Sequence, residues 1–370
     1  MDNTDPDIIF DKDGVCNWWH GFHAIRALEP DDAEREVFLK RKLTTIKEAG
    51  RGKPFDCIIG LSGGVDSSYI AYLAKKWDLR PLVVHFDNGW NDEMAVANIE
   101  RTLKKLGFKL QTFVINWPEF RDLQRAYFKA GVVDLEVPTD HMIFAALHKI
   151  AAEHGIRYIL SGNNFATEWV LPSAWLYKKS DLMNIRGIHR AFGQLPMKQL
   201  PRLGVWQRLY FQKVRLIETV EILQLVPYSK RMAKRILMEE LDWLDYGGKH
   251  YESVFTRFYQ GCILPERFGI DKRKAHLSNL ICNGEMTRDE ALLELSKPTY
   301  EVWRQEEDRR YIAKKLGWSG SEFREILTIP PRHQEEFGSD MRQALFVNKL
   351  IQIISPFVRF RRKIFHSHGL

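Results

Sequence analysis

Short apolar runs alternate with helical patterns between residues 57 and 162. The apolar runs have the length of buried parallel strands, and the segments between them repeat apolar residues at helical spacing. The expected strands are 57–61, 81–86, 109–115 and 157–162, and the expected helices are 67–77, 92–106, 119–130 and 139–154. Strands that alternate with helices of this length predict βαβ units. We therefore expect an α/β fold with a doubly wound, Rossmann-like parallel sheet, whose ligands bind beyond the carboxyl ends of the strands.

The pattern changes on both sides of this core, and the changes define four predicted regions. An N-terminal segment, 1–50, ends in charged, helix-forming residues and precedes the nucleotide-binding core, 51–170. Residues 171–340 scatter Trp, Arg, Pro and Gly around an amphipathic helix at 229–241, so we expect a mostly helical region that shapes the substrate pocket. Residues 341–370 form a basic amphipathic tail, which would rest on anionic lipid or a partner, or dock as a terminal helix on its own domain.

Composition excludes some classes of protein. With 370 residues, 45% hydrophobic and 28% charged, the chain is an ordinary globular sequence. It holds no apolar run of about 18 residues, and its acidic start, MDNTDPD, does not resemble a secretion signal, so we expect a cytoplasmic protein without a transmembrane segment. No two of its four cysteines form a CxxC pair, so neither a disulfide framework nor a zinc site is expected. The net charge of +7 suits either nucleic acid or anionic small substrates.

One segment between the first expected strand and helix has the composition of a phosphate-binding loop. It reads Ser62-Gly63-Gly64-Val65-Asp66-Ser67-Ser68. Two adjacent glycines let backbone N–H groups close around an oxyanion, hydroxyl groups add donors, and the helix N-terminus adds partial positive charge. The GxxxxGK[ST] pattern of a Walker A loop is absent. The alternative is a plain Gly-Ser turn between a strand and a helix.

This segment is similar to the PP-loop, SGGxDS, of the ATP-pyrophosphatase superfamily. In that superfamily the loop holds the pyrophosphate leaving group while the α-phosphorus of ATP is attacked. The resemblance implies that Ser62 and Asp66 act in catalysis. It also implies that ATP is bound by Ser62, Gly63, Gly64, Asp66, Ser67 and Ser68.

Two further strand ends carry polar residues that suit a nucleotide. Asp87 follows the second strand, where doubly wound folds commonly contact a ribose or adenine edge, although a turn-forming aspartate is an equal alternative. The segment SGNNFATE follows the fourth strand, and we expect Gly162 and Asn163 to complete the nucleotide site, with Asn164 and Glu168 as further candidates. An Asn-rich loop is also ordinary turn chemistry.

Beyond the loop, the chain resembles the N-acetyl sugar amidotransferase family of surface-polysaccharide biosynthesis. The matching stretches are TDPDIIFDKDGVCN, the PP-loop, VVHFDNGWN, SGNNFATE and DYGGKHYESVFTRFYQGCILPERFGIDKRKAHLSNLICNGEMTRDEAL. The resemblance implies that ATP adenylylates the acetamido oxygen of a nucleotide-linked sugar and that ammonia then displaces AMP. The products would be an acetamidino sugar for O-antigen or lipopolysaccharide biosynthesis, AMP and pyrophosphate. ATP and Mg²⁺ are the implied cofactors, since the charge of the triphosphate needs neutralisation.

The resemblance also implies partner proteins. The family works with a separate glutaminase and a cyclase-like partner, and no cysteine here lies in a recognisable glutaminase elbow, so we expect ammonia to come from such a partner. We expect no nucleic-acid partner. In the family's GVCNxC motif, Trp19 replaces the second cysteine and leaves Cys16 alone, so we predict no metal site.

The long C-terminal block carries charged residues that suit a sugar nucleotide. The substrate-binding candidates are Lys249, Glu252, Arg257, Lys272 and Arg273. Arg257 is the first choice because an arginine fork grips phosphate or carboxylate oxygens bidentately; its alternative is an ordinary solvated arginine. His250 is a candidate catalytic residue that relays a proton from the attacking ammonia, unless it only packs or forms a structural hydrogen bond.

Two other functions fit parts of the sequence. A tRNA-modifying enzyme of the same superfamily, of the thiolase or lysidine synthetase type, would also use a PP-loop and a basic surface. The isolated cysteines and the lack of a recognisable RNA-binding appendage speak against it. The second is a non-catalytic ATP-binding module, against which the intact Asp66 and the large second half of the chain argue.

Overall fold

The structure is a computed structural model that describes residues 1–245, 252–347 and 349. At its centre lies a five-stranded parallel sheet with the order β3-β2-β1-β4-β5. The strands are β1 (Cys57–Gly60), β2 (Pro81–Asp87), β3 (Lys109–Val114), β4 (Tyr158–Ser161) and β5 (Glu218–Glu221). The order reverses at β1, which creates a switch point between β1 and β4 at the carboxyl edge of the sheet. The prediction of a doubly wound parallel sheet is confirmed.

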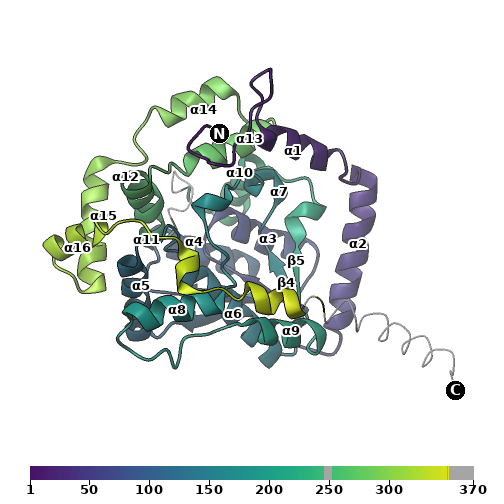
Figure 1. Cartoon of the computed structure of the whole chain (residues 1–370). Helices are drawn as coiled ribbons and strands as arrows, with labels where there is room; N and C mark the ends of the chain where they lie inside the picture. Colours follow the sequence, from purple (N-terminus) through teal and green to yellow (C-terminus); the bar gives the residue numbers. More distant parts are fainter. Residues whose placement is uncertain (246–251, 348, 350–370) are drawn as a thin grey trace.

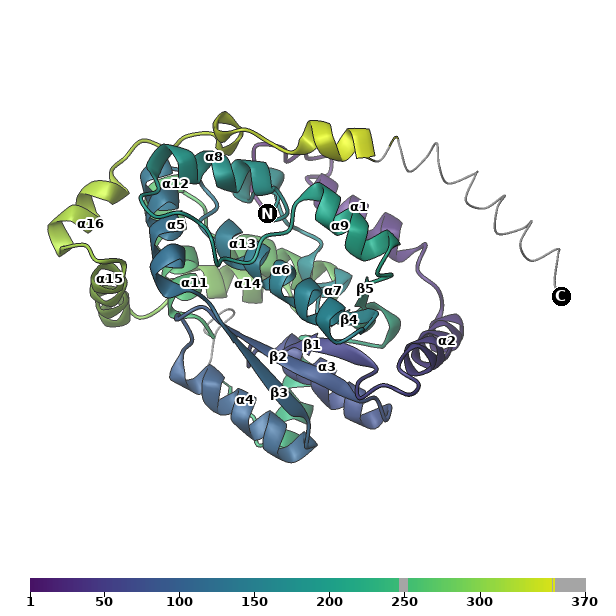
Figure 2. The same cartoon turned by 90° about the horizontal axis from the view of Figure 1, so that it is seen from below.

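Helices cover both faces of the sheet because successive strand residues point in opposite directions. Ile59 packs with the apolar side of α3, whereas its neighbour Ile58 packs with Leu147 of α6. The four helices of the core are α3 (Val65–Lys76), α4 (Glu93–Leu106), α5 (Trp117–Ala130) and α6 (Val137–Glu153). Figure 2 shows α3 and α4 on one side of the sheet and α5 and α6 on the other. Burial on both faces requires continuous apolar runs, which is the pattern the sequence displays.

The fifth strand, β5, was not expected from the sequence. It pairs with β4 from Tyr158↔Glu218 to Ser161↔Glu221. As an edge strand it buries only Val220, so a single apolar residue in four gives no strand pattern to detect. It comes from the region expected to be mostly helical. The sheet therefore extends past the predicted core boundary at residue 170.

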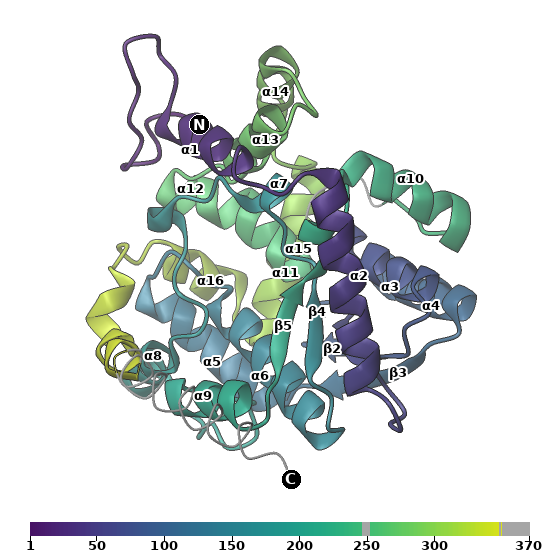
Figure 3. The ribbon, with the colours of Figure 1, turned by 90° about the vertical axis from the view of Figure 1, so that its right-hand side faces the viewer.

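The remaining helices surround this core. They are α1 (Asn17–Arg26), α2 (Asp32–Ala49), α7 (Phe165–Glu168), α8 (Leu182–Phe192), α9 (Val205–Lys213), α10 (Lys230–Leu241), α11 (Val254–Phe258), α12 (Leu264–Phe268), α13 (Arg273–Cys282), α14 (Arg288–Leu295), α15 (Val302–Leu316), α16 (Gly320–Leu327) and a last helix that begins at residue 341. Figure 3 shows α2 and α10 beside α3, and residues from all three share one buried cluster. In the described ranges, no helix has the length and apolar character needed to cross a membrane.

Figure 1 shows α15 and α16 beside α5. Buried residues of these helices belong to one large, strongly aromatic core. Its buried rings include Trp90, Phe128, Phe258, Trp318 and Phe323. Backbone hydrogen bonds attach the start of this block to the loop after β2: Asp92 N donates to the Glu252 carbonyl oxygen at 3.0 Å, and Val254 N donates to that of Trp90 at 2.9 Å. The pairing brings the C-terminal block to the carboxyl edge of the sheet.

Candidate active site

A cavity of about 600 Å³ lies at the carboxyl edge of the sheet. Small-molecule pockets typically measure roughly 300–1,000 Å³. The ends of β1, β2 and β4 line it together with α6, α7 and the start of the C-terminal block. Its lining includes Ser62, His85 and Gly162 from the sheet edge, and Glu252, Gln260 and Lys272 from the block. The cavity therefore joins the two parts of the chain that the sequence singled out.

Gly63 shapes the loop between β1 and α3. Its φ is +83°, and a Cβ there would lie 2.4 Å from the carbonyl oxygen of Ala95, so only glycine fits. The indole Nε1 of Trp243 donates to the carbonyl oxygen of Gly63 at 3.0 Å and supports the turn. Because α3 begins directly after Gly64, its first backbone N–H groups have no partners inside the helix. The loop thus offers a helix N-terminus to an anion.

Ser62 and Ser67 place two hydroxyl groups on this loop. Their Oγ atoms are 3.1 Å apart, and Gly64 N donates to Ser62 Oγ at 3.3 Å. Ser62 is exposed and lines the cavity. Ser68 is fully buried, and its hydroxyl has no hydrogen-bond partner within the described part of the chain. Of the three serines expected to hold phosphate, the structure brings Ser62 and Ser67 to the loop and turns Ser68 into the core.

Asp66 lies on the first turn of α3, against the end of β4. A Cβ at Gly162 would approach the Cβ of Asp66 to 3.1 Å, so the tip of β4 and the loop are in direct contact. The hydroxyl of Tyr228 donates a hydrogen bond to the Asp66 carboxylate. Burial is the main reason that the pKa of Tyr228 lies far above its ordinary value, and the negative charge of Asp66 raises it further. Tyr228 therefore stays protonated and holds this carboxylate, a role that no sequence motif indicated.

The end of β2 contributes a histidine, His85, that no motif in the sequence indicated. His85 is 9% exposed, with its Nδ1 3.0 Å from the carbonyl oxygen of Leu61 and its Nε2 3.0 Å from Asn91 Nδ2. Because a carbonyl oxygen only accepts, the neutral ring carries its proton on Nδ1. Asp87 accepts from Gly89 N at 2.8 Å and from Asn91 Nδ2 at 3.2 Å, the contacts of a turn-forming aspartate. Nucleotide binding by Asp87 stays a prediction.

A network of paired charges forms another wall of the cavity. Lys179 Nζ lies 2.8 Å from Asp134 and 3.2 Å from Asp140, and Lys272 Nζ lies 3.7 Å from Glu136. Burial raises the pKa of Asp140, and the neighbouring carboxylates add to this while Lys179 opposes it. Burial lowers the pKa of Lys179, but the negative charges of Asp140, Asp134 and Glu136 outweigh this effect and raise it overall. These acidic residues come from the loop before α6 and from α6 itself, where no motif marked them.

Some of the binding residues predicted from the sequence line the cavity, and others lie away from it. Those that line the cavity are Ser62, Gly162, Asn163, Glu168, Glu252 and Lys272. Asn164 instead caps the short helix α7 with its side chain. Arg273 is outside the lining and donates to Asp271 and to three backbone carbonyl groups. Lys249 and His250 lie outside the described residues.

Arg257 also lies outside the cavity lining and is only 4% exposed. Its Nε and Nη2 donate to the two carboxylate oxygens of Asp308 at 2.9 and 3.0 Å, and its Nη1 donates to Asp92 at 3.0 Å. These bonds join α11 to α15 and to the N-cap of α4. The fork expected to grip substrate thus contacts two protein carboxylates, and substrate binding by Arg257 stays a prediction.

The described residues were compared with the ligand groupings that metal ions need. Within 1–245, 252–347 and 349, no three His, Cys, Asp or Glu side chains are grouped to hold an ion. All four cysteines, including Cys16 of the N-terminal segment, are free thiols.

The SGGVDSS loop lies at the switch point of the parallel sheet, which is where folds of this kind bind their ligands. Two protein families match parts of the chain: residues 57–164 match "Asparagine synthase", and residues 252–351 match "LPS biosynthesis protein WbpG-like, C-terminal domain". The two matches confirm the resemblance inferred from the sequence. They support an ATP-utilising amidotransferase of the lipopolysaccharide-biosynthesis type.

Solved structures that resemble the chain include two synthetases. One is "Structure of NMN synthetase from Francisella tularensis", at a TM-score of 0.33 and 14% identity, covering 79% of this chain and 98% of that one. The other is "NH3-dependent NAD synthetase from Campylobacter jejuni subsp. jejuni NCTC 11168 in complex with the nitrate ion", at a TM-score of 0.32 and 15% identity, covering 77% and 95%. No curated protein sequence matches the chain significantly.

Proposed function

We propose that the protein is an ATP-dependent amidotransferase that converts the acetamido group of a nucleotide-linked sugar into an acetamidino group for O-antigen or lipopolysaccharide biosynthesis. The observation that carries the proposal is the shared cavity. Ser62 of the loop lines the same space of about 600 Å³ as Glu252 and Lys272 of the WbpG-like domain. A triphosphate at the loop would therefore meet a substrate held by that domain.

In the first step, the acetamido oxygen attacks the α-phosphorus of ATP. The bond from this phosphorus to pyrophosphate breaks, the amide nitrogen loses its proton, and an O-adenylyl imidate forms. The loop glycines and the hydroxyl groups of Ser62 and Ser67 would stabilise the charge that develops on pyrophosphate. Mg²⁺ would supply further charge neutralisation, and Asp66 is the carboxylate beside the loop that would contact it.

In the second step, ammonia attacks the imidate carbon. The attack forms a new carbon–nitrogen bond, and the carbon–oxygen bond to AMP then breaks. One proton of the attacking ammonia is lost to solvent or to a base, so that a neutral acetamidino group remains. An amide alone is a poor electrophile, so the adenylyl group provides the missing leaving group. The site must also exclude water, because hydrolysis of the imidate would return the amide. We propose Glu252 and Lys272, which line the cavity, as substrate contacts, and retain Lys249 and His250 as candidate substrate-binding and proton-relay residues.

The decisive experiment is an assay with ATP, Mg²⁺, an ammonium salt and UDP-linked diacetamido sugars. We expect AMP and pyrophosphate to appear only with a suitable sugar, together with a product in which one oxygen is replaced by NH, detected by mass spectrometry. AMP release that depends on tRNA instead of a sugar would contradict the proposal and favour a tRNA-modifying enzyme. ATP binding without AMP formation under any condition would favour a non-catalytic module.

A further inference from the structure

Two stretches of the sequence, 182–217 and 341–370, contain no acidic residue. They hold seven and six Lys or Arg residues respectively. The whole chain has 55 basic and 48 acidic residues, so the remainder outside these stretches has six more acidic than basic side chains. The net positive charge of the protein is therefore concentrated in two segments.

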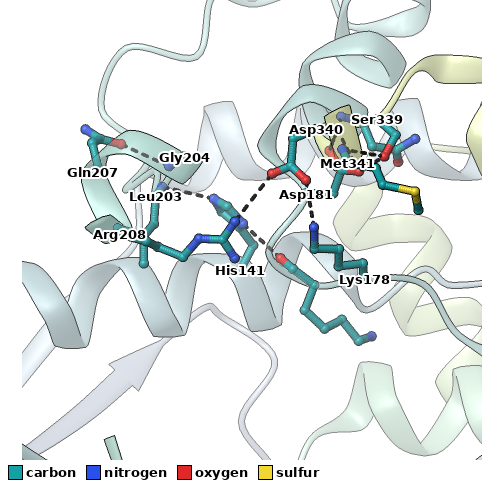
Figure 4. A network of polar contacts seen from close by, with 12 residues as sticks. His141, Lys178, Asp181, Leu203, Gly204, Gln207, Arg208, Ser339, Asp340 and Met341 are labelled. Carbon is teal, nitrogen blue, oxygen red and sulfur yellow. Dashed lines mark hydrogen bonds and ion pairs between the residues drawn. The ribbon is translucent and has the colours of Figure 1, made fainter. Parts of the chain in front are cut away.

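The described parts of these two segments meet in the fold. The first contains α8 and α9, and the second contains the helix that begins at residue 341, which Figures 1 and 2 show next to α9. Asp340 is 1% exposed and attaches the start of this helix: its carboxylate lies 2.8 Å from Lys178 Nζ and 3.5 Å from Arg208 of α9 (Figure 4). Its backbone N donates to Asp181 at 3.0 Å. The terminal helix is thereby fixed against α9.

Both helices expose large apolar side chains. These are Trp206 (52% exposed), Tyr210 (48%) and Val214 (65%) along α9 and at its end, and Met341 (60%), Leu345 (56%) and Phe346 (55%) on the terminal helix. Trp206, Tyr210 and Val214 are spaced by four residues, which places them on one side of α9. Met341 and Leu345 have the same spacing and lie on one side of the terminal helix, and Phe346 directly follows Leu345. Large apolar side chains exposed together on neighbouring helices are typical of an interaction site.

Exposed basic residues accompany these six apolar side chains. They are Lys213, Arg215, Arg342 and Lys349. Across the described residues, no ion pair joins any of the four to an acidic side chain. We call the six apolar and four basic residues together the α9 face. Its positive charge is not compensated within the described part of the chain.

We propose that the α9 face binds the surface of an anionic lipid bilayer. Aromatic and aliphatic side chains on one side of a helix enter the boundary between headgroups and acyl chains, while flanking Lys and Arg attract anionic headgroups. Residues 350–370, which follow directly in the sequence, add four basic residues and no acidic one. RNA would use the charges but would leave Val214, Met341 and Leu345 in water, so a bilayer accounts for more of the face.

The test is co-sedimentation of the full chain with vesicles. We expect binding to phosphatidylcholine vesicles that contain about one third phosphatidylglycerol, release by salt, and little binding to phosphatidylcholine alone. The triple variant Trp206→Ser/Leu345→Ser/Phe346→Ser should lose this binding. A matched variant at exposed apolar positions elsewhere, Leu292→Ser/Leu293→Ser/Trp303→Ser, should keep it.

Charge reversal tests the electrostatic half of the proposal. Each basic residue near an anionic membrane strengthens binding by about fivefold, so Lys213→Glu/Arg342→Glu/Lys349→Glu should weaken it by about a hundredfold or more. The control Lys104→Glu/Arg310→Glu/Lys314→Glu, on exposed positions of α4 and α15, should bind as the parent does. Thermal unfolding checks that every variant is folded. The proposal is overturned by equal binding to both vesicle types, by equal loss in the control variants, or by binding to single-stranded RNA but to neither vesicle.

Discussion

At the scale of single residues, the SGGVDSS loop allows a conformational requirement to be tested separately from a chemical one. Gly63→Ala puts a Cβ 2.4 Å from the Ala95 carbonyl oxygen at a φ of +83°, so we expect a loss of about 1–3 kcal/mol in unfolding free energy together with loss of AMP formation.

Ser62→Ala removes only an exposed hydroxyl and should lower AMP formation by about a hundredfold at unchanged stability. Denaturant unfolding and AMP assays measure both effects, with the exposed Ser321→Ala as a control. Wild-type activity of Ser62→Ala would remove the PP-loop assignment.

Tyr228 tests whether the Asp66 carboxylate must be held in place. Tyr228→Phe deletes the hydroxyl that donates to Asp66, and a hydrogen bond to a charged group contributes about 1.5–3 kcal/mol. We expect kcat/KM for ATP to fall by tenfold or more, which is the change that a loss of this free energy produces. The KM for the sugar should stay unchanged. Tyr72→Phe, on the same helix as Asp66, is the control and should behave as wild type. A parallel loss for ATP and sugar would instead indicate a general effect on the fold.

At the scale of elements, Arg257 joins three helices through two carboxylates. Arg257→Ala leaves Asp308, which is 6% exposed, without its partner, and breaking a buried pair in this way costs about 3–5 kcal/mol. We expect Arg257→Ala to lower the free energy of unfolding strongly and Arg257→Lys to lower it nearly as much. The double variant Arg257→Met/Asp308→Leu should recover most of the lost stability, because it leaves no unpaired carboxylate at position 308. A stable Arg257→Ala protein whose only defect is a raised sugar KM would restore the substrate-binding role expected from the sequence.

His141 links α6 to two loops only while its ring is neutral. Its Nδ1 lies 2.9 Å from the Lys179 carbonyl oxygen. Leu203 N donates to its Nε2 at 3.1 Å, as Figure 4 shows. Burial lowers the pKa of His141 below its ordinary value of 6.5, so the unfolded chain binds this proton at a higher pH than the folded protein does. Its contribution to stability is therefore complete above about pH 6.5 and falls on acidification, by up to about 1.4 kcal/mol per pH unit, until the folded-state pKa is passed.

The measurement is denaturant unfolding between pH 7 and pH 5. His141→Gln should show a shallower loss of stability over this range than the parent, because it lacks the titrating ring. His333→Gln, at an exposed position, should keep the parental slope. Identical slopes in all three proteins would contradict the role of His141.

At the scale of the whole molecule, the nitrogen donor can be tested on the isolated chain. Burial raises the pKa of Cys57, Cys262 and Cys282, the last to about 11, so none of these three is a thiolate at neutral pH. We expect product with ammonium salts and none with glutamine. Activity with glutamine by the pure chain, abolished by Cys16→Ala, would contradict a separate glutaminase. Cys282→Ala serves as the matched control.

Among the predictions made from sequence, those that depend on neighbouring residues were the most reliable. Apolar runs such as the one that begins at Cys57 indicated the strands, and the SGGVDSS segment indicated the loop, because backbone geometry and helix N-termini are determined by a few consecutive residues. The same locality explains why contiguous blocks of the sequence carry the two family matches. The edge strand β5 escaped because its neighbour in the sheet, not its own composition, makes it a strand.

The sequence by itself therefore determined the alternating strands and helices, the glycine-rich SGGVDSS loop and the kind of enzyme that this chain resembles. Only the tertiary structure decided which charged side chains face the cavity. Arg257 finds its carboxylate partners 51 and 165 residues away in the chain, and Tyr228 reaches Asp66 across 162 residues. Such pairings depend on how helices pack in three dimensions, and a single sequence carries no local signal of them. A charge expected at the substrate can therefore be neutralised within the protein, while a tyrosine that no motif indicated contacts Asp66 of the SGGVDSS loop.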